Sequence, residues 1–313
     1  MVNHHEKYAR LLAAAKPLPP LPAAVVHPCD ETSLAGVIRA AEIGLIAPVL
    51  VGPAARIRAV AARYGLDISA FAIVDTPHSH ASAAEGVRLV REGRSECLVK
   101  GSLHSDELMG AVVAREDGLR TARRITHCFV VDVPTYPEAL IISDAAVNIT
   151  PTLADKVDIV QNAIDLAGAL GISEIRVAIL AAVETVNPKV LSTVEAAALC
   201  KMAERGQITG ALLDGPLALD NAINPRAAEM KNINSRVAGR ANVLIVPDME
   251  AGNLLAKSLT FLANADIAGI VLGARVPIVL TSRADSVESR LASSAVAVLL
   301  ARARREAATR TAT

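Results

Sequence analysis

The sequence is poor in aromatic residues: its 313 residues include three Tyr, three Phe and no Trp. Proteins that stack nucleic-acid bases on their side chains rely on such residues, so the composition argues against this class of binding. The core must instead be built from Ala, Val, Leu and Ile, since the hydrophobic fraction is 52%. A chain of this length and hydrophobicity suits one large or two medium domains.

The sequence also lacks an excess of charge of either sign, because 32 basic side chains balance 32 acidic ones. A general binder of nucleic acid or of membrane surfaces would carry a basic field. No apolar run approaches the length of about 18 residues that a membrane span needs. Residues 1–12 lack the apolar stretch of a signal peptide. We therefore expect a cytoplasmic protein without nucleic-acid or membrane partners.

Several sequence motifs of catalysis are absent. The four cysteines are widely spaced and form no CxxC pair, which favours core positions over disulfides or a zinc site. The chain has no GxGxxG, GxxxxGK[ST], HExxH or GxSxG motif. Its seven histidines do not cluster with acids at the spacing of metal ligands. We therefore expect chemistry that uses neither a bound metal nor a covalent serine.

What the sequence does contain is an alternation of short apolar runs with longer amphipathic stretches. Runs such as 46–51 and 176–180 predict strands, and 154–170 predicts a helix with one apolar face. Apolar runs of this kind are typical of strands buried on both faces, so the fold class is α/β with largely parallel sheets. Because about ten strands exceed one ordinary sheet, we expect two domains with a cleft between them. Their expected bounds are 1–146 plus about 275–313, and 147–274.

Local signals predict details of this arrangement. Pro134 and Pro137 separate the strands expected at 126–131 and 139–142, which indicates a hairpin. Thr32 or Ser33 is the expected cap of the first long helix. The polar tail from Arg302 to the end is expected to fray.

Ligands of α/β proteins gather where strands end, so polar residues that follow apolar runs are candidates for a site. The strongest candidate is the segment 280–286, which offers Ser282, Arg283 and Asp285 before the last helix. Hydroxyls, a guanidinium and the N–H groups of a helix start suit an anion. The alternative is a helix cap with a solvated Arg283, and the residues alone favour neither.

A second candidate is Lys100, which ends a predicted strand and precedes Gly101. Its ammonium group suits a phosphate, and the glycine lets the backbone approach a ligand. The alternative is an ordinary turn between strand and helix with an exposed lysine.

The second half contributes weaker candidates. Asn148 and Thr150 lie at the expected domain boundary, where they suit a carbonyl or phosphate oxygen. Asp214 ends a predicted strand, and Asn253 and Lys257 lie on the helix that follows another. The alternatives are a polar linker and helix caps.

Taken in order, seven segments of the chain resemble the phosphate acetyltransferase and phosphate butyryltransferase family. They are residues 99–101, 118–121, 143–149, 214–217, 238–248, 250–253 and 281–286. The resemblance extends from about residue 24 to residue 303. It implies a fold like that of the isocitrate and isopropylmalate dehydrogenases, with the last helix returning to the first domain. It further implies a homodimer and direct acyl transfer between phosphate and coenzyme A, with no metal, no acyl-enzyme and no tightly bound cofactor.

The resemblance also implies roles for single residues. Arg283 would hold the phosphate, and Ser282 would orient the thiol or the developing oxyanion. Two positions depart from the archaeal-type acetyltransferases: Met109 stands where they have a second arginine, and Ser289 stands where they have an aspartate base. Both departures look more like the butyryltransferase branch and its acetyltransferase relatives.

Three hypotheses follow. The first is a phosphate acyltransferase that acts on acyl-CoA and phosphate, with acetyl favoured over butyryl and Asp285 or Glu288 as the base. Its catalytic residues would be Ser282, Arg283 and Asp285, and its substrate-binding residues Lys100, Asn148, Thr150, Asp214, Asn253 and Lys257. The second is a metal-dependent dehydrogenase of the related fold. The third is a non-catalytic acyl-CoA-binding protein.

Overall fold

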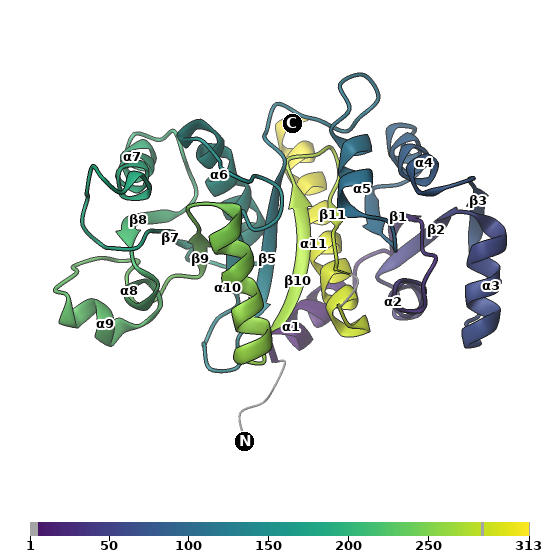
Figure 1. The fold of residues 1–313 in the computed structure, drawn as a ribbon, viewed down its shortest axis with the longest axis horizontal. Coiled ribbons are helices and arrows are strands. Elements are labelled where there is room, and N and C mark those ends of the chain that lie inside the picture. Colours follow the sequence, from purple (N-terminus) through teal and green to yellow (C-terminus); the bar gives the residue numbers. More distant parts are fainter. Residues whose placement is uncertain (1–5, 283–284, 313) are drawn as a thin grey trace. The chain divides into compact units, whose positions relative to one another are not determined.

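A computed structural model of the chain describes residues 6–282 and 285–312. The described residues group into two compact units, which we name by their place in the sequence. The middle unit contains residues 6–7 and Thr126–Ile267. The terminal unit contains the described residues of Tyr8–Ile125 and Ala268–Thr313. Both units consist of mostly parallel strands covered by helices, as the alternating pattern predicts (Figure 1).

The strands of the terminal unit follow the order β3-β2-β1-β4-β11-β10. Neighbouring strands are parallel except for the antiparallel pair of β10 and β11. The elements are α1 (Glu6–Ala15), β1 (Leu21–Val26), α2 (Glu31–Glu42), β2 (Ile46–Gly52), α3 (Ala54–Tyr64), β3 (Ala72–Asp75), α4 (Ser79–Arg91), β4 (Cys97–Lys100), α5 (Ser105–Val112), β10 (Asp266–Leu272), β11 (Ile278–Val279) and α11 (Val287–Ala312).

The helices of the terminal unit lie on both faces of its strands. The chain runs outward through β1, β2 and β3 and then returns past them to β4. Because such crossovers are right-handed, α2 and α3 lie on one face and α4 on the other. α4 packs against α5, and α11 packs against α2. The direction of the chain reverses between β1 and β4, the kind of place where ligands of α/β proteins bind.

The strands of the middle unit follow the order β5-β6-β9-β7-β8. They are parallel except for the β5–β6 pair, where Cys128 lies opposite Ser143. This antiparallel pair confirms the predicted hairpin. The elements are β5 (Thr126–Asp132), β6 (Leu140–Ser143), α6 (Leu153–Ala169), β7 (Arg176–Leu180), α7 (Leu191–Glu204), β8 (Leu212–Leu217), α8 (Leu219–Ile223), α9 (Pro225–Met230), β9 (Val243–Ile245) and α10 (Met249–Leu262).

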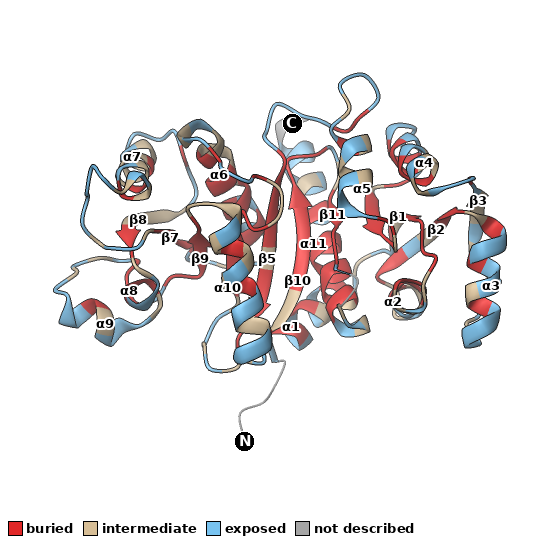
Figure 2. Ribbon diagram, viewed as in Figure 1, coloured by how far each residue is buried: buried red, intermediate tan, exposed pale blue. Residues whose placement is uncertain are grey.

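The cores are aliphatic, as the scarcity of aromatic residues predicts. The largest fully buried side chains, such as Leu50 and Leu98 in the terminal unit and Ile142 in the middle unit, are all Leu or Ile. Figure 2 shows many of the strands buried, while the helices are buried on one side and exposed on the other. This pattern follows from strands that are apolar on both faces and helices that are apolar on one.

The two units differ from the sequence-based domain bounds at three segments, of which the first is residues 6–7 of the middle unit. Residues 126–146 belong to the middle unit, because β6 pairs in parallel with β9 and the Tyr136 hydroxyl donates to the Ala241 carbonyl over 2.6 Å. Residues 268–274 belong to the terminal unit, because β10 pairs with β11 through Ile270 and Val279. Strand pairing between distant segments thus sets where each unit begins.

Helix α11 shows where the prediction for the tail was wrong. The helix continues through Ala312 instead of fraying from Arg302. The Arg302 guanidinium pairs with the Glu306 carboxylate one turn later at 2.6 Å, and Arg304 donates to the Ala274 carbonyl at 3.2 Å. Among the described residues, no helix combines the length and apolar character that crossing a membrane requires.

Candidate active site

The segment between β11 and α11 forms a closed turn in the terminal unit. The Ser282 N–H donates to Asp285 Oδ2 over 2.7 Å, and the Asp285 N–H donates to the Ser282 carbonyl over 3.3 Å. Ser282 is exposed, so its side chain is accessible at the end of β11. Arg283, the predicted phosphate ligand, lies outside the described residues. Ser282 and Asp285 are therefore brought together in one turn.

Lys100 lies beside this loop. It ends β4, and β4 pairs in parallel with β11, where Val99 lies opposite Val279. The Lys100 side chain is buried and its Nζ donates to the Thr281 carbonyl over 3.3 Å. The alternative of an exposed lysine in a turn is thereby excluded, and a buried ammonium group lies next to the candidate loop.

Asp285 is the better placed of the two candidate bases. Burial raises the pKa of its carboxyl group, although the Ser282 N–H and the charges of Arg290 and Lys100 act in the opposite direction. A carboxylate with a raised pKa accepts a proton more readily than an exposed one. Glu288 lies exposed in the first turn of α11.

In the middle unit, Asn148 is held by the buried carboxylate of Asp144. Asp144 Oδ1 accepts the N–H groups of Ala146 and Val147, both at 3.0 Å. Its Oδ2 accepts the His127 N–H at 3.1 Å and the Asn148 side-chain amide at 2.5 Å. Asp144 was not among the predicted site residues. Its signal is an acid that directly follows an apolar strand, with an amide four residues later.

Asn253 on α10 lies against the same loop. Its Nδ2 donates to the Ala145 carbonyl over 3.4 Å. A side chain at Gly252 would bring its Cβ within 2.9 Å of the Asp144 carbonyl oxygen, so glycine is needed for this approach. Lys257 is exposed one helical turn after Asn253. The structure therefore brings Asn148 and Asn253 to one loop, with Lys257 nearby on α10.

Asp214 and Thr150 are not part of this arrangement as described. The sequence places Asp214 at the end of a strand, but β8 continues to Leu217 and Asp214 lies within it, opposite Ala178. Gly215 and Pro216, a pair that normally ends a strand, lie within β8. β8 lies two strands from β9, which corresponds to about 10 Å. Thr150 is exposed after β6.

The four cysteines are unsuited to nucleophilic chemistry. Burial raises the pKa of the Cys29 thiol to about 11. It raises the pKa of Cys97, Cys128 and Cys200 to about 12 each. A thiol with so high a pKa stays protonated near neutral pH and is a poor nucleophile. Among the described residues, no group of three or more His, Cys, Asp or Glu side chains is arranged to hold a metal ion.

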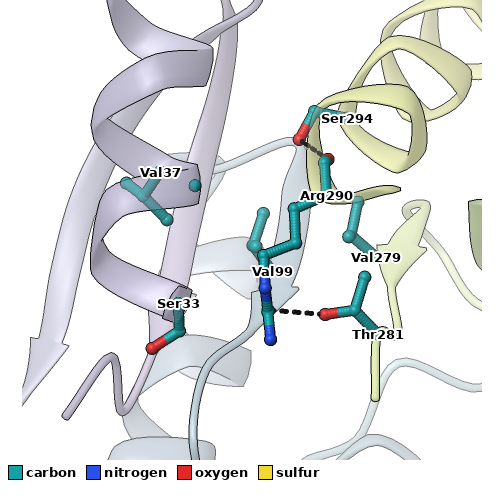
Figure 3. A pocket seen from close by; sticks show the side chains of 8 residues that line it. Ser33, Val37, Val99, Val279, Thr281, Arg290 and Ser294 are labelled. Atoms are coloured by element: carbon teal, nitrogen blue, oxygen red, sulfur yellow. Dashed lines mark hydrogen bonds between the residues drawn. The ribbon is translucent and has the colours of Figure 1, made fainter. Parts of the chain in front are cut away.

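Arg290 is a residue of this region that the sequence analysis missed. It is the fourth residue of α11, and Figure 3 shows its side chain directed toward Thr281. Its guanidinium donates to Thr281 Oγ1 over 2.7 Å and to the Ser282 carbonyl over 3.0 Å. The available signal was a basic residue one to two turns after a polar loop that begins a helix.

The family model for phosphate acetyl/butaryl transferase matches residues 81–298. The chain belongs to this family. The matched range includes Lys100, the β11–α11 loop and the loop that Asp144 holds, so both clusters lie within the family's region. The family resemblance stated from the seven segments is thereby confirmed.

Individual family members are similar over nearly the whole chain. The phosphate acetyltransferase of Rhizobium meliloti is 65% identical over 301 residues, which cover 96% of this chain and 95% of that protein. The phosphate butyryltransferase of Clostridium acetobutylicum is 39% identical over 272 residues, covering 87% and 90%. A solved branched-chain phosphotransacylase from Enterococcus faecalis V583 has a TM-score of 0.78 at 30% identity, covering 90% of this chain and 99% of that one.

Proposed function

We propose that this chain is a phosphate acetyltransferase, which interconverts acetyl-CoA plus phosphate and coenzyme A plus acetyl phosphate. The observation that carries the proposal is the similarity to the Rhizobium meliloti phosphate acetyltransferase along nearly the full length of both chains. The β11–α11 loop beside the buried Lys100 supports it, since an anionic substrate needs cations and hydrogen-bond donors.

The reaction assigns distinct tasks to the residues of this loop. In the direction of acetyl-CoA formation, the thiol sulfur attacks the carbonyl carbon, the C–S bond forms and the C–O bond to phosphate breaks. The thiol has an ordinary pKa of about 8.5 and must lose its proton. We assign Asp285 as the general base that accepts this proton. General-base catalysis contributes about 10²–10⁴-fold to the rate. Ser282 would donate to the developing oxyanion, and Lys100 and Arg283 would hold the leaving phosphate.

The middle unit would contribute substrate-binding groups. The amides of Asn148 and Asn253 lie around the loop after β6, and Lys257 adds an exposed cation on α10. We propose that these residues, together with Thr150, contact coenzyme A or the acyl phosphate. We also propose a contact from Asp214, which lies within β8.

Four further points belong to this proposal. Coenzyme A acts as a substrate, and no cofactor is tightly bound. The protein is a cytoplasmic homodimer. Its fold is related to that of the isocitrate and isopropylmalate dehydrogenases. Transfer is direct, within a ternary complex. The raised pKa values of the four cysteine thiols of the protein support this, because protonated thiols are poor nucleophiles at neutral pH.

The decisive experiment measures thiol release from acyl-CoA in the presence and absence of phosphate. Acetyl-CoA, propionyl-CoA and butyryl-CoA are compared, and we expect phosphate-dependent release with the highest kcat/KM for acetyl-CoA. A higher value for butyryl-CoA would instead make the chain a phosphate butyryltransferase. Binding of coenzyme A without release from any of the three would leave a non-catalytic acyl-CoA-binding protein.

The role of Arg283 is tested with Arg283→Ala. If the guanidinium holds the phosphate as charge develops on it, kcat should fall by about 10²–10³-fold. Arg302→Ala, which removes an exposed guanidinium of the same unit, is the matched control and should keep the wild-type rate. An unchanged rate in Arg283→Ala would remove Arg283 from the site.

A further inference from the structure

Arg290 occupies an unusual place for an arginine. Only 6% of its surface is exposed, and its side chain runs from α11 toward α2, next to Val99 of β4 (Figure 3). The site is shaped for this side chain, because a Cβ at Gly36 of α2 would lie 2.8 Å from Arg290 Cδ. Gly36 thus leaves the space through which the arginine reaches the β11–α11 loop.

Among the described residues, the hydrogen-bond partners of the Arg290 guanidinium are neutral. Nη1 donates to the Thr281 hydroxyl and Nη2 donates to the Ser282 carbonyl. Nε is buried and has no hydrogen-bond partner in the described part of the chain. The carboxylates of Asp30 and Asp285 raise the pKa of Arg290 only electrostatically, and burial, which lowers it, outweighs them.

A buried cation of this kind is a poor way to stabilise a fold. Moving a guanidinium out of water is unfavourable unless an anion and a full set of acceptors compensate. An apolar side chain of similar length would fill the same space without leaving a donor unsatisfied. What an apolar side chain cannot do is hold Thr281 and Ser282 at the same time. The planar fork of the guanidinium sets both their distance and their orientation.

We propose that Arg290 is a positioning residue of the acyl transfer. Its hydrogen bonds to Thr281 and Ser282 hold the loop so that the Ser282 hydroxyl meets the substrate. The inference rests on the proposed function of the β11–α11 loop. Arg290 acts through that loop, because Nη1 and Nη2 of its guanidinium donate to two loop oxygens. The loop is then anchored by Lys100 Nζ at the Thr281 carbonyl, by Arg290 and by the Asp285 carboxylate.

The first test replaces Arg290 with methionine and with lysine. Methionine fills the space without charge, so Arg290→Met should melt at the same temperature as the wild type or higher, while kcat falls by about 10²-fold because the loop is misplaced. Lysine keeps the charge but donates from a single point. Arg290→Lys should therefore also lose most of the rate, with the KM for phosphate changed much less than kcat.

Chemical rescue separates positioning from a general loss of structure. Arg290→Ala opens the space that the side chain occupied. Millimolar guanidinium should therefore raise the kcat of this variant at least tenfold. Ammonium at the same ionic strength should restore none, because it cannot form the two-pronged contact. Thr281→Val removes the acceptor of Nη1 at equal size and should lower kcat, whereas Thr281→Ser keeps it and should not.

One control variant and one further test variant complete the design. Arg302→Met alters an exposed arginine of the same helix, whose partner is Glu306, and should leave the rate unchanged. Gly36→Ala places a Cβ against the Arg290 stem and displaces it, so it should lower kcat. Wild-type kcat in Arg290→Met would overturn the inference. Loss of both the rate and the fold in Arg290→Met, with no rescue of Arg290→Ala by guanidinium, would also overturn it.

Failure of the proposed function is distinguishable from failure of this inference. If the wild-type protein transfers no acyl group, the proposed function fails, and hydrogen exchange still tests the anchoring. The Ser282 and Asp285 amides should then exchange at least tenfold faster in Arg290→Met than in the wild type, while those of α11 beyond Ser294 stay unchanged. Equal exchange in the two proteins would overturn the anchoring role.

Discussion

Burial of the Asp285 carboxyl group has opposite effects on catalysis and on stability. Burial raises its pKa, which makes it a better proton acceptor but a less favourable charge in the folded state. Because the folded pKa lies above the unfolded one, ionisation of Asp285 lowers stability as the pH rises through these values. Asp285→Asn should therefore keep or raise the melting temperature at pH 7 while kcat falls by about 10²–10⁴-fold.

The pH profile of kcat identifies which carboxylate acts. A base works only when ionised, so the wild-type rate should fall as the pH falls through the raised pKa of Asp285. Asp285→Asn should lack this acidic limb. Glu288→Gln changes the exposed carboxylate of the adjacent helix turn and is the matched control. If Glu288→Gln loses the limb and Asp285→Asn keeps it, the base is Glu288.

At the scale of residues, the sequence identifies groups that follow strands but not the groups that hold them. Ser282 and Lys100 could be selected because each follows an apolar run, and the structure brings both to one loop. Arg290 and Asp144 were missed, because the local patterns that mark them do not show which residues they contact. Asp214 was misplaced, because a strand continues through a Gly-Pro pair that normally ends one.

At the scale of elements, Glu107 joins two helices of the terminal unit. Its Oε1 accepts the Ser79 hydroxyl at the start of α4 over 2.6 Å, and its Oε2 accepts the His104 N–H at the start of α5 over 2.8 Å. His80 lies 3.2 Å from Oε1. The hydrogen bond from Ser79 is the largest cause that lowers the pKa of the Glu107 carboxyl group. One carboxylate thus satisfies donors at both helix starts.

We predict that Glu107→Gln lowers the free energy of unfolding by about 0.5–1.5 kcal/mol at pH 7, because the amide nitrogen cannot accept one of these bonds. The stabilisation is present above the unfolded pKa of about 4.3. It is lost as the pH falls through the lower folded pKa. Urea unfolding at pH 7 and pH 3 measures this directly. The variant should differ from the wild type at pH 7 and much less at pH 3. Glu116→Gln, an exposed control in the same unit, should match the wild type at both.

The elements themselves were predictable where local chemistry decides them. The prolines between β5 and β6 correctly predict a hairpin, because they fix a turn between two apolar runs. The start of α2 was misplaced: Asp30, not Thr32 or Ser33, is the cap, and its Oδ1 accepts the Ser33 N–H over 2.8 Å. α1 was not predicted, and α8 and α9 are separate helices that divide at Asn224. Several nearby residues can cap a helix, and only the folded backbone selects one.

At the scale of the whole chain, the alternating pattern predicts the α/β class but not which distant strands pair. β11 lies between β4 and β10, although it follows β4 by well over a hundred residues in the sequence. Its pairing with β4 is what brings Thr281 to Lys100. Such non-local pairings depend on the packing of complete elements, so the family resemblance was needed to connect these segments into a single site.

The predicted homodimer can be tested on an apolar surface of the middle unit. On α10, Leu254, Phe261 and Leu262 are exposed by 66%, 75% and 84%. Leu254 and Phe261 are seven residues apart and share one side of the helix. Ile149, exposed by 66%, lies at the start of α10, where its carbonyl accepts the Met249 N–H. Exposed apolar groups on one surface favour an interface with a partner, and under the proposed homodimer that partner would be a second copy of the chain.

We predict that the double variant Phe261→Ser with Leu262→Ser is a folded monomer, while the wild type is a dimer, in sedimentation equilibrium at micromolar concentration. Leu191→Ser removes a leucine of α7 that is equally exposed, at 66%, and should remain a dimer. A double variant that stays dimeric would place the interface elsewhere, and a monomeric Leu191→Ser would place it on α7. Far-UV circular dichroism must show intact helices in each variant, because a dimer lost through unfolding would say nothing about the α10 surface.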